Sequence, residues 1–285
     1  MNIRIKFQKY GVMKFIGHLD MMRYFQKAIR RAGIDIAYSG GYSPHQIMSF
    51  AAPLGVGVTS DGEYFDIEVN SSKSSQESID ALNQAMVEGI SILEYKALPD
   101  TAKTSMSLVA AADYLIYEKS GYEPFFSSLE ELQEKIHAFY EDQQEIIITK
   151  QTKKSEIEMN LKQFIYEMKA VTLGDIPQKD ANRSAKYGLF LKVCTGSSNN
   201  IKPELVLEAF CRFFHLEDNP FRFQIHRLEV YAKSDEIPVK GEKEREDYKK
   251  HLKHLRKTFA DEGKEFPEFL PLGALGEEIL WETNC

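Results

Sequence analysis

The chain has 285 residues, of which 43% are hydrophobic and 28% are charged, and its formal net charge is −7. This composition predicts one large or two ordinary globular domains and excludes the disordered class. Residues 1–15 alternate apolar with polar instead of forming a signal-peptide core, and no run approaches the roughly 18 apolar residues of a membrane span. We therefore expect a cytoplasmic protein with no membrane contact.

The charge is distributed unevenly along the chain. Residues 1–50 hold eight Lys and Arg against two acids, a net charge of +6, so the other residues carry −13. A basic segment on an acidic protein predicts a polyanion or an acidic partner at that end. The eight cations are Arg4, Lys6, Lys9, Lys14, Arg23, Lys27, Arg30 and Arg31.

The first half of the chain begins with a strand and a basic helix. Residues 2–9 alternate with period two and predict a strand with Ile3, Ile5 and Phe7 on one face. A helix is predicted from His18 to Ala32, ended by Gly33. Its predicted inner face is formed by Leu19, Met22, Phe25, Ile29 and Ala32, and its outer face by Arg23, Lys27, Arg30 and Arg31.

The remaining segments complete an order that occurs twice. Residues 34–38 predict a strand, 39–45 a glycine turn, 46–58 and 62–69 extended segments, 75–89 a helix and 91–98 a strand. The same order returns over residues 106–232, with room for one extra strand. We therefore predict an α+β protein with two tandem ferredoxin-like (βαββαβ) halves and antiparallel sheets. The predicted domains are residues 1–100 and 106–235, followed by a charged helical tail over 236–285.

Residues 14–55 form the candidate functional region. Cations that alternate with aromatic side chains are typical of single-stranded nucleic-acid sites, because the cations neutralise phosphates while the rings stack on bases. The helix start near Gly17 also presents free N–H groups, which suit an anion. The predicted contacts are Arg23, Lys27, Arg30, Arg31, Tyr38, Ser39, Tyr42, His45 and Phe50, with His18, Asp20 and Gly41 lining the site.

Each of these features has an alternative explanation. The cationic stripe is also compatible with a solvated helix face, and the glycine turn with a plain connector. His18 and Asp20 could ligate a metal or act as a base with its orienting group, although Asp20 also suits the positive end of the helix. His18 and His45 could instead cleave RNA without a metal, one as base and one as acid.

Other catalytic and cofactor chemistry has little support in the sequence. The three cysteines, Cys194, Cys211 and Cys285, are too far apart for an iron–sulfur or zinc motif, so we expect no cofactor of the protein's own. No GxSxG, HExxH, Walker or GxGxxG pattern occurs. Conventional hydrolases, kinases and dehydrogenases are therefore not predicted.

Residues 14–69 resemble the bacterial radical-SAM-linked protein family, a domain of unknown function. The resemblance rests on Phe15, His18-Leu19-Asp20, Ala28–Gly33, Tyr38-Ser39, Gly41-Tyr42, Pro44-His45, Ser49-Phe50 and Pro53-Leu54-Gly55. It is specific over residues 3–70, weaker to about 235 and absent in the tail. Members occur alone or at the C-terminus of cobalamin-type radical SAM proteins. A serine common before the family's histidine is Gly17 here, which counts against a hydroxyl role at that position.

The resemblance implies an accessory role in RNA or ribosome modification. It implies a radical SAM protein as partner, which would supply the S-adenosylmethionine and the iron–sulfur cluster. We expect an RNA-binding or substrate-presenting module more than an enzyme. Two alternatives stay open: a metal-independent endoribonuclease using His18 and His45, similar in fold to CRISPR repeat-binding (RAMP-like) endonucleases, and a protein-interaction module that never contacts RNA.

Overall fold

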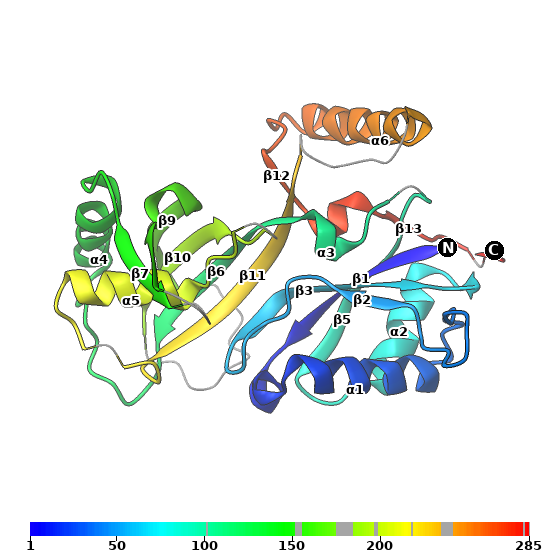
Figure 1. Cartoon of the computed structure of the whole chain (residues 1–285), viewed down its shortest axis with the longest axis horizontal. Helices are drawn as coiled ribbons and strands as arrows, with labels where there is room; N and C mark the ends of the chain where they lie inside the picture. Colours follow the sequence, from blue (N-terminus) through cyan, green and yellow to red (C-terminus); the bar gives the residue numbers. More distant parts are fainter. Residues whose placement is uncertain are drawn as a thin grey trace. The chain divides into compact units, whose positions relative to one another are not determined.

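The computed structural model describes residues 1–100, 102–151, 156–174, 185–196, 199–217, 219–234, 242–281 and 283–284. The protein is a mixed α/β chain with a multi-strand sheet and, in the described residues, helices α1 to α6 (Figure 1). It divides into two compact units. The first unit comprises Met1–Val56, Asp61–Ala110 and Val230–Cys285, and the second comprises Gly57–Ser60 and Ala111–Glu229.

The first unit is built on a sheet with strand order β13-β5-β1-β3, and β2 pairs with β3. The predicted first strand is confirmed, because Ile3, Ile5 and Phe7 are all 0% exposed. β1 pairs with β5 antiparallel, with an irregularity after Lys6. The strands are β1 (Asn2–Lys9), β2 (Met48–Phe50), β3 (Thr59–Glu68), β5 (Ile90–Ala97) and β13 (Glu277–Glu278).

Helices α1 (His18–Arg31) and α2 (Ser75–Ala85) pack on one face of this sheet and share its core (Figure 1). α2 begins with a capping box in which Ser74 and Glu77 bond each other's backbone amides. α1 ends where predicted, and Gly33 follows it with φ +68°, a conformation that favours glycine.

The predicted inner face of α1 was partly wrong. Met21, Phe25, Ala28 and Ile29 are the buried residues, whereas Leu19 is 62% exposed. At about 100° per residue, Leu19 lies roughly 120° around the helix from Phe25, so both cannot face the sheet. Leu19 therefore belongs to the exposed surface.

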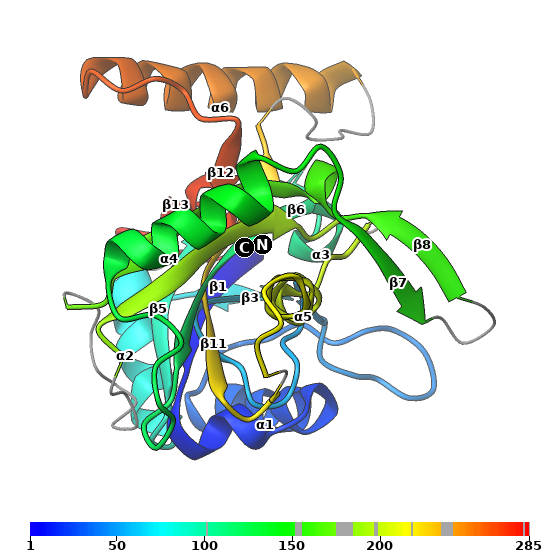
Figure 2. The same ribbon diagram turned by 90° about the vertical axis from the view of Figure 1, so that its left-hand side faces the viewer.

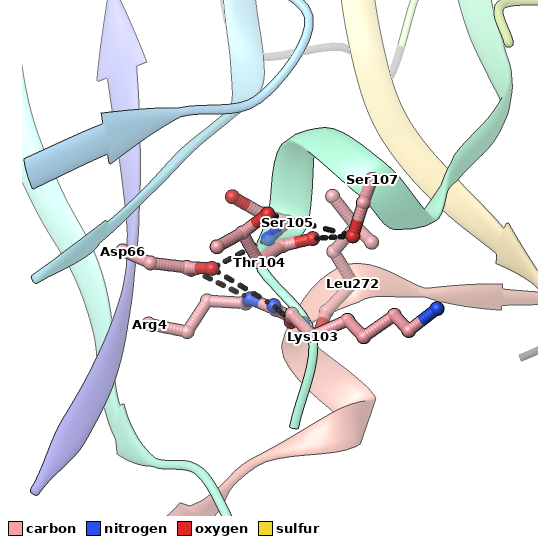
Figure 3. A network of polar contacts seen from close by, with 7 residues as sticks. All are labelled: Arg4, Asp66, Lys103, Thr104, Ser105, Ser107 and Leu272. Atoms are coloured by element: carbon pink, nitrogen blue, oxygen red, sulfur yellow. Dashed lines mark hydrogen bonds and ion pairs between the residues drawn. The ribbon is translucent and has the colours of Figure 1, made fainter. Parts of the chain in front are cut away.

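A buried polar network closes the other face of the sheet (Figure 3). Arg4 of β1 is 1% exposed and forms two hydrogen bonds with Asp66 of β3, at 2.9 and 3.1 Å. Its guanidinium also donates to the carbonyl oxygens of Leu272 and Lys103, at 3.1 and 3.2 Å. The Ser105 amide donates to Asp66 at 2.5 Å. The network therefore ties two strands, the segment after β5 and the C-terminal region together.

The C-terminal region belongs to the first unit instead of forming a separate tail. The predicted helix is present as α6 (Glu242–Asp261), and β12 (Phe269–Pro271) pairs with residues 231–233. A 3-10 turn, Leu272–Leu275, follows, and β13 extends the sheet beside β5. Ile279 is part of the same hydrophobic core as α1 and α2. Two short elements, β4 (Ser71–Ser72) and β14 (Thr283–Asn284), pair with each other.

The second unit has the strand order β11-β6-β10-β9. β10 pairs antiparallel with both β6 and β9. β11, in contrast, pairs in parallel with residues 59–60, so the prediction of purely antiparallel sheets was wrong. The strands are β6 (Val109–Glu118), β9 (Ile165–Thr172), β10 (Tyr187–Cys194) and β11 (Phe223–Lys233).

The remaining elements of this half flank the sheet. α4 (Leu129–Ile136) continues into a π-helical turn, His137–Glu141, and α5 (Pro203–Phe213) precedes β11. The short helix α3 (Ser105–Leu108), which precedes β6, belongs to the first unit. The extra extended segment forms a hairpin of its own, β7 (Ile147–Gln151) with β8 (Glu156–Asn160), beside the sheet (Figure 2). Among the described residues, no helix is long and apolar enough to cross a membrane.

Replacing Asp66 with alanine should lower the free energy of unfolding by about 3–5 kcal/mol, because Arg4 would keep its charge without a partner in a buried site. Urea denaturation followed by circular dichroism measures the loss. The paired change Arg4→Met with Asp66→Leu should recover part of it, since no buried charge remains, while the Ser105 amide and the carbonyls of Lys103 and Leu272 lose their partners.

The control is Asp20→Ala, which removes the exposed ion pair with Arg23 and should cost no more than about 1 kcal/mol. An Asp66→Ala protein as stable as this control would show that the buried pair contributes little.

Candidate nucleic-acid interface

The four predicted cations of α1 form one exposed face. Arg23, Lys27, Arg30 and Arg31 are all exposed, at positions i, i+4, i+7 and i+8. The inner residues of the same helix pack into the core, so the cationic side faces solvent. We call these four residues the cationic face. It carries most of the exposed positive charge expected for residues 1–50.

Three other cations of the basic N-terminal segment do not contribute to a surface patch. Arg4, Lys6 and Lys9 lie within 2.9, 3.9 and 3.7 Å of Asp66, Glu94 and Glu63, respectively. These acids lie outside residues 1–50, so a count restricted to that segment misses them. The net charge of +6 therefore overstates the charge that a ligand would meet.

The cationic face keeps its charge available to a ligand. Arg23 pairs with Asp20 at 3.0 Å, but both side chains are 68% exposed, and such surface pairs contribute about 0–1 kcal/mol. Arg30 and Arg31 donate to uncharged backbone carbonyls, those of Gln26 at 3.2 Å and Ala85 at 3.0 Å. For Lys27, the described residues supply no hydrogen bond or ion pair. Among the described residues, three of the four cations therefore form no ion pair.

The carbonyl oxygen of Gln26 joins this face to the following loop. It accepts from Arg30 Nε and also from the Gln46 side-chain amide, each at 3.2 Å. The same Gln46 nitrogen lies 3.4 Å from the hydroxyl of Tyr38. Gln46 is only 6% exposed and is not among the site residues predicted from the sequence. Gln46 lies two residues before β2, in a segment where apolar residues alternate, and this position was the sequence signal that could have indicated its burial.

Tyr38 and Tyr42 offer the exposed aromatic rings that a stacking site requires. Tyr38 is 50% exposed and Tyr42 fully so. Gly41, at φ +99°, allows the sharp turn between them. Tyr38 bridges to Gln46 across the base of the turn, so the loop has a fixed base and an exposed tip.

Ser39 and His45 form a polar pair at the base of the loop. The backbone amide of His45 donates to Ser39 Oγ at 3.1 Å, and Ser39 Oγ lies 2.8 Å from His45 Nδ1. The serine oxygen keeps a second lone pair, so Ser39 Oγ can either donate to Nδ1 or accept from it. When Ser39 Oγ donates, the neutral imidazole carries its proton on Nε2. His45 is exposed, so this nitrogen is open to a ligand.

Phe50 has a different role from the predicted one. It is 7% exposed, stacks on Phe65 with ring centroids 5.0 Å apart, and belongs to the core. The ring of His18 packs against the ring of Phe50 in a T-shaped arrangement, with the two ring centroids 5.4 Å apart. Phe50 is therefore not available to stack on a base; it supports His18 at the start of α1.

The members of the predicted chemical pairs make no direct contact with each other in the part of the chain that the structure describes. His18 and His45 share no hydrogen bond or ring contact in the part of the chain that the structure describes. Asp20 pairs with Arg23. No group of three or more His, Cys, Asp or Glu among the described residues could hold a metal ion. Of the cysteines, Cys211 is buried, Cys194 is partly buried, and Cys285 lies outside the described residues.

We expect Ser39 Oγ to donate to Nδ1, so neutral His45 should carry its proton on Nε2, and Ser39→Ala should give a mixture of the two tautomers. Nitrogen chemical shifts of the ring, recorded about two pH units above the ordinary histidine pKa, distinguish the two forms. Wild-type protein with the proton on Nδ1 would show that Ser39 Oγ accepts instead. Ser43→Ala, in the same exposed loop, is the matched control and should leave the tautomer unchanged.

Two comparisons with known proteins bear on this chain. A search of curated proteins gives no match. A family model described as an uncharacterized protein conserved in bacteria, DUF2344, matches residues 2–203, which include the cationic face, the loop and most of the second unit. Because the match covers well over half of the sequence, the chain belongs to the DUF2344 family of uncharacterized bacterial proteins.

Proposed function

We propose that this protein is an RNA-binding accessory module that presents its RNA to a partner enzyme. The observation that carries the proposal is the link between the cationic face and Tyr38 through the Gln26 carbonyl. It holds a phosphate-binding group, Arg30, near an exposed aromatic ring. Single-stranded nucleic-acid sites combine these two features.

The cationic face suits an extended phosphate backbone. Residues Arg23 to Arg31 span about 12 Å along the helix at about 1.5 Å per residue. Arginine can hold a phosphate through two parallel N–H groups, and three of the four cations are arginines. With its proton on Nε2, His45 adds a neutral N–H donor on the loop that carries Tyr38. These groups would position the strand without reading its sequence.

Tyr38 and Tyr42 would supply base stacking. Each exposed ring can stack on a base, a contact worth about 1–3 kcal/mol in proteins of this type. Stacking depends little on base identity, so we expect weak sequence preference at these two positions. The exposed tip of the loop leaves Tyr42 free to adjust to a bound strand.

The partner enzyme, which the resemblance implies is a radical SAM protein, would contact an apolar group at the start of α1. Val12, Phe15 and Leu19 are 76%, 62% and 62% exposed. Val12 and Phe15 share one side of a 3-10 turn, Gly11–Phe15, that has no buried residue. Large exposed apolar side chains near one another are typical of protein-binding surfaces. RNA and enzyme would then occupy neighbouring parts of one helix.

The proposal also includes the topology of the two halves and the cellular location of the protein. The strand orders β5-β1-β3-β2 and β11-β6-β10-β9 both place the last strand beside the first and the third beside the second. This order supports two tandem ferredoxin-like halves over residues 1–100 and 106–235. We propose a cytoplasmic role, where RNA and an iron–sulfur enzyme are both available.

Replacing Arg23 and Arg30 with alanine should weaken binding of a labelled single-stranded RNA about tenfold or more at low salt. Removing two phosphate contacts should also reduce the slope of log K against log salt by about 1.4. Fluorescence anisotropy across a salt series measures both effects.

Lys202→Ala with Arg212→Ala removes the same charge from exposed sites at α5 and serves as the control. Equal affinities for the two double variants would contradict the assignment of RNA to the cationic face.

The partner site makes a separate prediction. Tagged protein purified after nuclease treatment should retain an iron–sulfur protein, identified by mass spectrometry and visible absorbance. Phe15→Ser with Leu19→Ser should lose it while keeping RNA affinity, because neither residue belongs to the cationic face. Phe221→Ser with Leu280→Ser changes equally exposed apolar residues and should retain the partner. Retention by the first double variant would place the enzyme contact elsewhere.

A further inference from the structure

The outer edge of β9 in the second unit borders a groove. β9 ends the strand order β11-β6-β10-β9, and its other edge has no strand partner among the described residues. The groove has a volume of about 500 Å³ and lies between this edge and α4. It is lined by Leu129, Glu130, Gln133, Glu134, His137 and Ala170.

The pairing register shows which backbone groups face the groove. Leu173 donates its amide to the Lys186 carbonyl at 2.9 Å, so odd-numbered residues at this end of β9 bond β10. Alternate residues point the other way. The Ala170 amide confirms this, because it donates to Gln133 Oε1 of α4 at 3.1 Å instead of to a strand. The backbone groups of Met168 and Thr172 therefore point away from β10 too, but Met168 is only 4% exposed, whereas Thr172 is exposed.

Gln133 occupies the position that the carbonyl of an added strand would take. Side chains that cover edge groups are a common protection against unwanted strand pairing. Only one of the three outward-facing residues is covered in this way by the described residues. At the other end of the strand, the Ile165 carbonyl accepts from Tyr140 at 2.9 Å. The exposed part of the edge is thus limited to a short segment.

The groove has a negative charge that selects among occupants. Glu130 and Glu134 are exposed carboxylates on its wall. Hydrogen bonds from its own backbone amide and from Ser128 lower the pKa of Glu130, so it is ionised at neutral pH. His137 lies 3.2 Å from both Glu141 and Asp142, which adds two further acids at the end of the helix. A polyanion would be repelled here, whereas a cationic segment would be attracted.

We propose that this groove binds a basic, extended segment of a partner protein, which adds as a strand to the outer edge of β9. Backbone hydrogen bonds to Thr172 and to the carbonyl of Ala170 would supply affinity, and Glu130 and Glu134 would select Lys or Arg at alternate positions. Leu129 offers an apolar contact to a side chain between them. The site differs from the proposed RNA surface in location, sign of charge and kind of ligand.

The test uses the full-length protein and a fluorescent peptide about eight residues long that alternates lysine with valine. Wild-type protein should bind it. A peptide with one central valine replaced by proline should bind at least about tenfold more weakly, because proline cannot donate to the strand edge. Equal binding of both peptides would overturn strand addition, since charge alone would then explain the affinity.

Protein variants locate the site. Glu130→Gln with Glu134→Gln should weaken binding about tenfold, whereas Glu262→Gln with Glu265→Gln, which removes the same charge from exposed sites elsewhere, should not. Gln133→Ala should strengthen binding about two- to tenfold by freeing the Ala170 amide. Hydrogen exchange at the exposed Thr172 amide should slow when the peptide is added. No binding by either wild-type protein or the Gln133→Ala variant would overturn the proposal and leave Gln133 as an edge-blocking residue only.

Discussion

The buried ion pair between Arg4 and Asp66 is the constraint on which the first unit depends. Each charge loses its hydration in the fold, a cost that is offset only when the remaining hydrogen-bonding groups are also satisfied. Backbone groups from three further places, at Lys103, Ser105 and Leu272, complete that requirement. If any of these segments moved away, the buried ion pair would lose a hydrogen-bond partner. The pair therefore links the N-terminal strand to a segment almost 270 residues away.

This constraint gives the first unit's sheet two different faces. One face is apolar and carries α1 and α2 over the cluster of Phe7, Phe25, Phe50 and Phe65. On the opposite face, charged side chains bond to the C-terminal region. Lys96, for example, donates to the carbonyl of Gly273 at 3.2 Å. The C-terminal region closes this charged face, whereas the basic residues of α1 lie on the outer side of the helical face.

Local patterns in the sequence were sufficient to predict β1 and the end of α1, but residues 34–38, predicted as a strand, form only isolated bridges at Ile36 and Tyr38. The alternation of residues 2–9 and the Gly33 stop of α1 are short-range signals, and both are confirmed. Tertiary partners were beyond such reasoning. Arg4 meets Asp66 62 positions away, so its burial has no local signature. Phe50 has an aromatic ring of the kind that can stack on a base, but only its packing against Phe65 shows that it belongs to the hydrophobic core. The parallel pairing of β11 is a long-range contact of the same kind.

The charge on this protein matters locally more than in total. A net charge of −7 would repel RNA if it acted as a single point. At physiological salt, however, charges farther apart than about 8 Å are largely screened from each other. A ligand at the cationic face responds mainly to Arg23, Lys27, Arg30 and Arg31, and one at the β9 groove responds mainly to Glu130 and Glu134. Screening of this kind allows one acidic protein to attract a polyanion and a basic peptide at separate surfaces. Lower salt would extend the range of the net charge and weaken this separation.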